Sequence, residues 1–123
     1  MKLYADRPSG FNIVTALGPG WVEINGRRHL RSLLLAPNEI DTHWGPMAGA
    51  PVEERHLHRL AAFAGHVLLL GTGLRQRFPA PALMRSLIDA GSALDVMDTG
   101  AACRTYNILV AEGRAVVAAL VIE

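Results

Sequence analysis

The sequence has few of the features that support cross-linking, strong charge or membrane insertion. One cysteine in 123 residues excludes an internal disulfide and fits a reducing compartment. The net charge of +1 gives no global attraction to nucleic acid or to an acidic membrane surface. No apolar run approaches the ~20 residues that span a bilayer. Met1–Pro8 also lacks the apolar core of a signal peptide, so we expect a cytoplasmic protein.

Apolar residues, in contrast, are abundant and make up half of the chain. That proportion allows a substantial core without disulfides or metals. The length is typical of one domain, so we predict a single domain over residues 1–123. Met1–Gly10 is expected to be a loosely held lead-in to this domain.

The first half of the chain is rich in strand-forming residues separated by turn signals. The predicted strands are Phe11–Leu17, Trp21–Ile24 and Arg27–Leu35. Gly18-Pro19-Gly20 marks the first turn, and Asn25-Gly26 tolerates the backbone angles of a tight hairpin. These features predict a small antiparallel meander, followed by a connector over 36–50 with at most one short strand.

The second half alternates short apolar runs with helical patterns. The predicted strands are 67–70, 94–97 and 116–122, and the predicted helices are 52–64, 81–90 and 100–112. Strands linked by helices favour parallel pairing with right-handed crossovers. The fold class is therefore α/β (α+β-like), an antiparallel meander joined to a βαβαβ half. The inward residues of the last two helices are predicted to be Leu83, Met84, Leu87 and Ile88, then Ala102, Tyr106, Leu109 and Gly113.

The carboxyl ends of these parallel strands are where ligands bind in open α/β sheets. That rule places Gly71, Thr72 and Gly73 beside Asp98 and Thr99. The two glycines let a backbone come close to a bound anion, which backbone amides can hold. The alternative is a tight strand exit packed against the neighbouring turn. Asp98 or Thr99 is expected to cap the last helix.

Two further residues of that helix are candidates for a site. Cys103 lies in the first turns, where the helix dipole can lower the pKa of a thiol, but a small buried cysteine is commoner than a nucleophile and is the favoured interpretation. Asn107 is a poor interior helix residue, so its side chain faces a site or holds a neighbouring loop. No residue is assigned as catalytic, and we expect neither a metal site nor a cofactor.

Other side chains bear on the class of partner. Arg27–Arg31 is a basic stretch on a predicted strand, but no aromatic residue interleaves it to stack bases. We interpret it as a solvated sheet edge and expect no nucleic-acid partner. Three aromatic residues are candidates for an exposed protein-binding patch: Trp21, Trp44 and Phe78.

A set of short motifs from Gly71 onward resembles a known family. The set is Gly71-Thr72-Gly73, Asp98-Thr99, Ala102-Cys103, Thr105-Tyr106-Asn107, Glu112-Gly113-Arg114 and Ala118-Ala119-Leu120. It resembles the domain-of-unknown-function family 498/598, whose eukaryotic members include a mitochondrial assembly factor for respiratory complex I and an adipogenesis-associated protein. The resemblance implies a compact α/β domain, with no agreed enzymatic activity. It also implies a protein partner, with respiratory-complex subunits as candidates.

Two hypotheses therefore stand side by side, and a third is weaker. The favoured one is a non-enzymatic interaction or assembly module. The alternative is a small-molecule or anion-binding protein, or an enzyme, that uses the strand-end edge with Cys103 as a nucleophile. The weakest is a nucleic-acid binder through Arg27–Arg31. The sequence sets neither the oligomeric state nor the identity of a partner.

Overall fold

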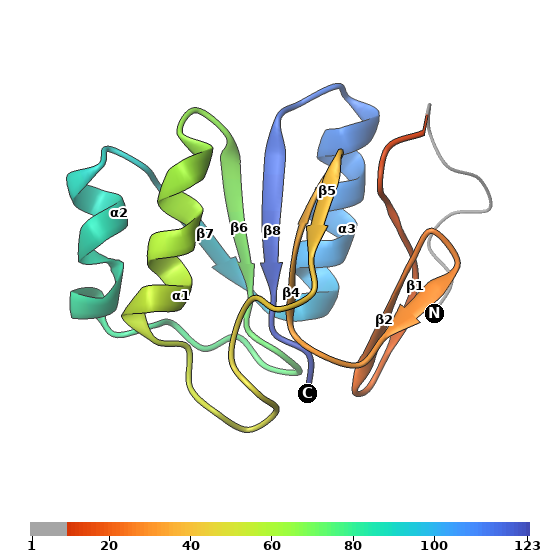
Figure 1. Cartoon of the computed structure of the whole chain (residues 1–123), viewed down its shortest axis with the longest axis horizontal. Helices are drawn as coiled ribbons and strands as arrows, with labels where there is room; N and C mark the ends of the chain where they lie inside the picture. Colours follow the sequence, from red (N-terminus) through yellow and green to blue (C-terminus); the bar gives the residue numbers. More distant parts are fainter. Residues whose placement is uncertain (1–9) are drawn as a thin grey trace.

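A five-stranded mixed sheet divides the molecule into two sides (Figure 1). The structure is a computed structural model that describes residues 10–123. The sheet has the order β5-β4-β8-β6-β7, in which β8, β6 and β7 are parallel and β4 is antiparallel to β5 and β8. The strands are β4 (Leu33–Ala36), β5 (Glu39–Asp41), β6 (Val67–Gly71), β7 (Leu94–Met97) and β8 (Val116–Leu120).

The two central strands are those with continuous apolar sequence. All five residues of β8 are buried, as are the last four of β6, because both faces of these strands are covered. The predicted α/β class and the parallel arrangement of the three later strands are confirmed. The prediction of one domain over 1–123, and the lead-in Met1–Gly10, extend beyond the described residues.

A second, antiparallel sheet contains β1 (Val14–Gly18), β2 (Trp21–Ile24) and β3 (Arg27–His29). The turn between β2 and β3 uses Asn25 at φ 53° and Gly26 at φ 85°, as the Asn-Gly pair predicts. The strand predicted over Arg27–Leu35 is wrong in one respect, because it is two strands in different sheets. The chain turns between them, where the Ser32 hydroxyl accepts a hydrogen bond from the Ile122 N–H (3.0 Å).

The three predicted helices are present, with two of them shorter or less regular than expected. They are α3 (Thr99–Ala111), α1 (Glu54–His58), which continues as the 3₁₀ helix η1 (Arg59–Phe63), and α2 (Arg85–Asp89), which follows the 3₁₀ helix η2 (Pro81–Met84). The prediction that Ile88 points inward is wrong, since its side chain is 56% exposed. The prediction assumed 3.6 residues per turn throughout 81–90, but η2 is a 3₁₀ helix with three residues per turn. The faces predicted for the residues that follow it are therefore shifted.

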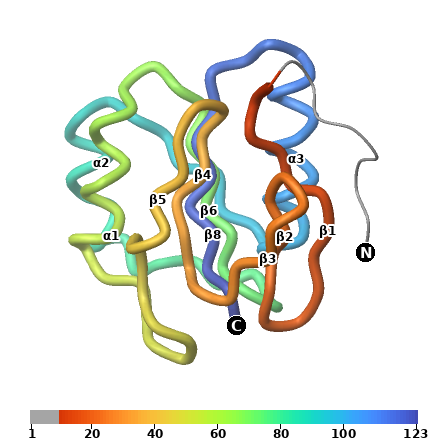
Figure 2. Tube along the Cα trace, turned by 45° about the vertical axis from the view of Figure 1, so that its right-hand side comes forward, coloured from red at the N-terminus to blue at the C-terminus, as the bar shows by residue number. Residues whose placement is uncertain are grey.

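The two faces of the large sheet bury separate clusters of apolar side chains. One cluster fills the space between that sheet, α3 and the second sheet, and the other lies under α1, η1, η2 and α2. Figure 2 shows β1–β3 beside α3 on one side, with α1 and α2 on the other. The inner face of α3 differs from the predicted set, because Leu109 is half-buried and Gly113 is exposed. Cys103, Asn107 and Val110 are buried instead.

Candidate functional site

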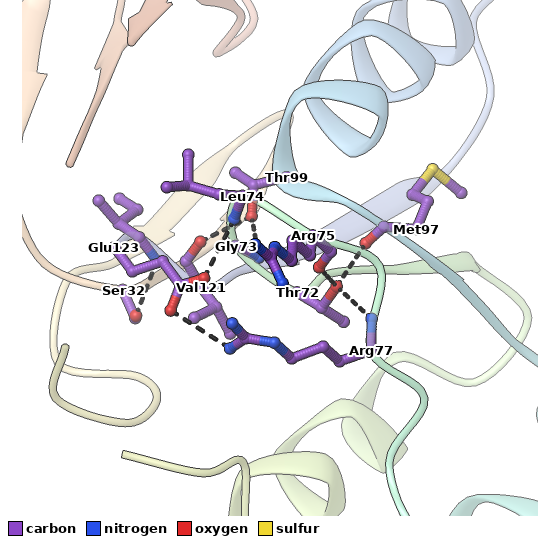
Figure 3. A network of polar contacts seen from close by, with 11 residues as sticks. Ser32, Thr72, Gly73, Leu74, Arg75, Arg77, Met97, Thr99, Val121 and Glu123 are labelled. Carbon is purple, nitrogen blue, oxygen red and sulfur yellow. Dashed lines mark hydrogen bonds and ion pairs between the residues drawn. The ribbon is translucent and has the colours of Figure 1, made fainter. Parts of the chain in front are cut away.

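The predicted neighbours at the strand-end edge lie together in the structure (Figure 3). The Gly73 N–H donates to the Thr99 hydroxyl (2.8 Å), and the Thr99 N–H donates to the Gly73 carbonyl (2.9 Å). Thr72 bonds to β7 through its N–H, which donates to the Met97 carbonyl (2.9 Å). Gly71 is in close contact too, since a Cβ there would lie 2.8 Å from the Thr99 Cα. The order of the parallel strands therefore brings these residues to one place.

The backbone amides of this turn already have partners within the chain. Besides the Gly73 amide, the Leu74 N–H donates to Oε1 of Glu123 (3.1 Å), and Nη1 of Arg77 lies 3.4 Å from the other carboxylate oxygen. The Arg77 N–H donates to the Thr72 hydroxyl (2.9 Å). The Glu123 carboxylate thus occupies the position that an external anion would take. The geometry favours a tight strand exit, and an added anion would have to displace Glu123.

Asp98 acts at this edge as a helix cap. It has extended backbone, and its Oδ1 accepts a hydrogen bond from the Ala101 N–H (2.8 Å). This contact satisfies one of the free amides at the start of α3. The capping prediction for Asp98 is confirmed, and Thr99 is instead the first residue of the helix.

Cys103 is not at the edge but in the core beneath it. Its side chain has 0% exposure, and burial raises the pKa of the thiol to about 12. The neighbouring Arg104 guanidinium lowers the pKa, but desolvation is the larger effect. Of the two interpretations of Cys103, the structure shows the buried, inert cysteine, and its position does not suit a nucleophile.

Asn107 is also remote from the edge, and its side chain pairs with the backbone of β1. Its Oδ1 accepts from the Val14 N–H (2.9 Å), and its Nδ2 donates to the Val14 carbonyl (2.7 Å). Next to it, the Tyr106 hydroxyl donates to the Asn12 carbonyl (2.8 Å), and burial raises the pKa of that phenol. Of the two interpretations of Asn107, the structure shows the one in which it holds a neighbouring segment.

A small cavity lies beside the strand-end edge. Its volume is about 210 Å³, and it is bounded by the β1–β2 turn, the two strand-end turns and residues 121–123. Asp98 and Thr99 contribute polar atoms, while Trp21 and Leu74 contribute apolar surface. The Arg28 guanidinium covers the Trp21 ring at 3.8 Å from its centroid. A small molecule would fit here with few polar contacts.

The three aromatic candidates for an exposed patch differ in their outcome. Trp44 is buried, with its Nε1 donating to the His56 carbonyl (2.9 Å), and Trp21 is half-buried. Phe78 is 72% exposed. Two residues at this edge were missed, Leu74 and Glu123. Leu74 had a visible signal, because an apolar residue directly after Gly73 and before Arg75 has no strand or helix to bury it.

Comparison with known proteins shows which family this chain belongs to. Residues 14–121 match the model of a family described as Protein of unknown function (DUF498/DUF598). The chain belongs to this family. A crystal structure of a protein from Bordetella parapertussis shares 39% identity and a TM-score of 0.83, with 95% of this chain and all of that chain covered. The fold of this family member is thus the fold described above.

Two of the curated relatives show what kinds of protein the chain resembles. The NADH dehydrogenase [ubiquinone] 1 alpha subcomplex assembly factor 3 of Danio rerio is 32% identical over 97% of this chain and 63% of its own length. The 13 kDa major membrane protein of Francisella tularensis is 35% identical over 51% of each chain. The chain spans about half to two thirds of the length of the curated relatives that it matches. Within residues 10–123, no helix has the length and apolar character needed to cross a membrane.

Proposed function

We propose that this protein is a non-enzymatic interaction module that assists the assembly of a membrane-bound NADH dehydrogenase complex. The observation that carries the proposal is similarity over 97% of the chain to a protein named as an assembly factor for such a complex. We place its action at the cytoplasmic side, in keeping with a chain that contains one cysteine. The compartment and the partner subunits are part of the proposal.

The chemistry of the strand-end edge supports a binding role over catalysis. The Thr99 hydroxyl donates to the Val121 carbonyl (2.6 Å) and accepts from the Gly73 N–H, so its hydrogen-bonding capacity is used within the fold. Asp98 caps α3, and Cys103 is buried. Catalysis requires a side chain that can exchange protons with, or attack, a bound substrate. The polar side chains of Asp98 and Thr99 form hydrogen bonds to backbone groups of the same chain.

The test is the amount of assembled complex in a host that makes an NADH dehydrogenase of this type. Deleting the gene is expected to reduce the fully assembled complex on native gels of solubilised membranes. Re-expression of the wild-type chain should restore it. Tagged wild-type chain should also recover subunits of that complex, identified by mass spectrometry. Unchanged complex in the deletion strain, together with no recovered subunit, would overturn the proposal.

Two variants make this test specific. Asn107→Leu removes a buried contact that holds the second sheet and should fail to restore assembly because the fold is weakened. Ile108→Ser changes an exposed neighbour on α3 and should restore assembly fully. Equal rescue by both variants would argue that the folded chain is not what the host requires.

A second candidate function rests on the cavity of about 210 Å³ beside Asp98 and Thr99. A small apolar molecule with one polar group would match this lining. Protein purified from its host would then show a non-covalent mass adduct by native mass spectrometry. The variant Leu17→Trp, which fills the cavity, should lose that adduct. Absence of any adduct on the wild-type protein, at every purification salt tested, would remove this candidate.

A further inference from the structure

Exposed apolar side chains are concentrated at one end of the fold. Six large apolar residues are exposed within residues 10–123, and four of them are Leu30, Met47, Leu74 and Phe78. Each of the four is between 63% and 72% exposed. All four lie in loops, whereas the other two, Ile88 and Ile108, lie on helices. We use the name loop face for the surface formed by the three loops that carry Leu30, Met47, Leu74 and Phe78.

The loop face lies where β6, β7 and β8 end (Figure 1). Leu30 and Met47 line one depression, and Nη2 of Arg31 contacts the Met47 sulfur at 3.4 Å. Residues 49–52 line a second depression together with Phe78 and Glu123. Leu74 is fixed to the same end through its bond to Glu123. Three separate loops therefore present these side chains on the same end of the large sheet.

An arginine adjoins three of these four apolar residues in the sequence. The pairs are Leu30-Arg31, Leu74-Arg75 and Arg77-Phe78. Within the described residues, Arg31 and Arg75 form no ion pair with a carboxylate. Arg77 pairs with Glu123 but keeps 61% of its side chain exposed. The net charge of the chain is only +1, so these three arginines are a local concentration of positive charge at the loop face.

We propose that the loop face is a docking surface for an anionic lipid bilayer, which it enters no deeper than the headgroup region. Apolar side chains at the tips of loops would enter the interface, and the adjoining arginines would contact lipid phosphates. A fluid lipid surface accommodates separate, protruding side chains, whereas a protein partner needs a matching pocket for each. The arginine beside each tip also has a long apolar stem, which suits a position at the boundary of the acyl chains.

This proposal goes beyond the proposed function, because it needs no protein partner and can be tested with lipid alone. The purified wild-type chain is mixed with vesicles of phosphatidylcholine and phosphatidylglycerol, or of phosphatidylcholine alone, and bound protein is measured by flotation. We expect binding to the anionic vesicles that falls as salt is added, and little binding to the neutral ones. A wild-type chain that does not float with anionic vesicles at low salt would overturn the proposal.

Variants with matched controls locate the contact. Leu74→Ser combined with Phe78→Ser should lower partitioning at least tenfold, and Phe78→Trp should preserve it because tryptophan favours the interface. Arg75→Gln should lower partitioning about fivefold, the effect of one basic side chain near an anionic surface. The controls are Ile108→Ser, on α3, and Arg114→Gln, in the turn before β8 at the opposite end of the sheet.

The controls distinguish specific lipid docking by the loop face from general adhesion of the protein to vesicles. Both are expected to bind vesicles as the wild type does, with unchanged thermal unfolding in every variant. If they lost binding as strongly as the loop-face variants, adhesion would be a general property and the proposal would fail. If the double serine variant instead lost recovery of complex subunits while lipid binding was absent in the wild type, the loop face would be a protein contact. Failure of lipid binding leaves the assembly test above unaffected.

Discussion

The two sides of the large sheet are built in different ways. On one side, the 13-residue helix α3 packs against the sheet and also binds the second sheet through the polar side chains of Tyr106 and Asn107. On the other side, α1 and α2 have five residues each. The 3₁₀ helix η1 follows α1, and the 3₁₀ helix η2 precedes α2. Short helices gain little stability from their own hydrogen bonds and depend on packing. We infer that the α3 side is the rigid part of the fold and that the α1–α2 side opens first.

At neutral pH, the largest expected effect comes from breaking the α3 side at its buried polar contact. Asn107→Leu leaves the N–H and the carbonyl of Val14 without their partners. We expect the free energy of unfolding to fall by about 3 kcal/mol, since each unpaired buried group costs roughly 1–3 kcal/mol. Urea unfolding measures this loss, with the exposed Ile108→Ala as the control. A loss equal to that of the control would mean that Asn107 does not hold the second sheet.

A core truncation on the α1–α2 side is expected to have a smaller effect. Leu87 is the buried residue of α2. Leu87→Ala should lower the free energy of unfolding by about 2 kcal/mol, near the low end for such changes, because a short helix relaxes into the space. Hydrogen exchange should show faster opening confined to residues 81–90. Uniform acceleration in both sides of the sheet would contradict the proposed difference between them.

Alkaline pH provides a probe of the α3 side alone. Burial raises the pKa of Cys103 from 9.0 to about 12, so at pH 9 to 12 the unfolded chain releases a proton that the folded chain keeps. The free energy of unfolding should therefore fall by about 1.4 kcal/mol per pH unit across this range. Below pH 9, this thiol contributes no slope. Cys103→Ala should flatten the slope by that amount, while the raised pKa of Tyr106 remains in both proteins.

The smallest expected effect concerns the loop that leads to the α1–α2 side. Glu123→Gln removes the charge that faces Arg77, whose side chain is largely exposed. The loss should be about 0.3 kcal/mol, as for other solvent-screened pairs. Hydrogen exchange at the Leu74 amide should quicken measurably, because its acceptor becomes a weaker one. Arg85→Gln, which breaks an exposed pair with Asp89, is the matched control and should leave Leu74 unchanged.

The sequence was most informative where the pattern was local. Continuous apolar runs such as 67–70 identify the central strands, and the rule for parallel strands predicts that Gly73 lies next to Thr99, as it does in the structure. The division between β3 and β4 was not visible, because Leu30 and Ser32 continue a strand-like pattern through the turn. The orientation of Ile88 failed because a 3₁₀ segment changes the count of residues per turn.

The residues chosen for the site show the same limit. Asp98 could be assigned as a cap because its partner is three residues away. The partner of Asn107 is 93 residues away, so a single sequence indicates only that the side chain has some buried or functional role. The burial of Cys103 depends on packing against both sheets, and its position in the helix could not reveal it. Glu123 became apparent only when the fold brought it to Leu74 and Arg77.

The pairing of Val14 with Asn107 has a consequence for the order of events during synthesis. Because 93 residues separate the two, the hairpin of β1 and β2 emerges from the ribosome long before its docking partner is made. Throughout that interval the apolar sides of Val22 and Ile24, which are buried in the finished protein, have no helix to cover them. Translation speed and chaperone supply therefore act on this hairpin, which is made before the helix that covers it.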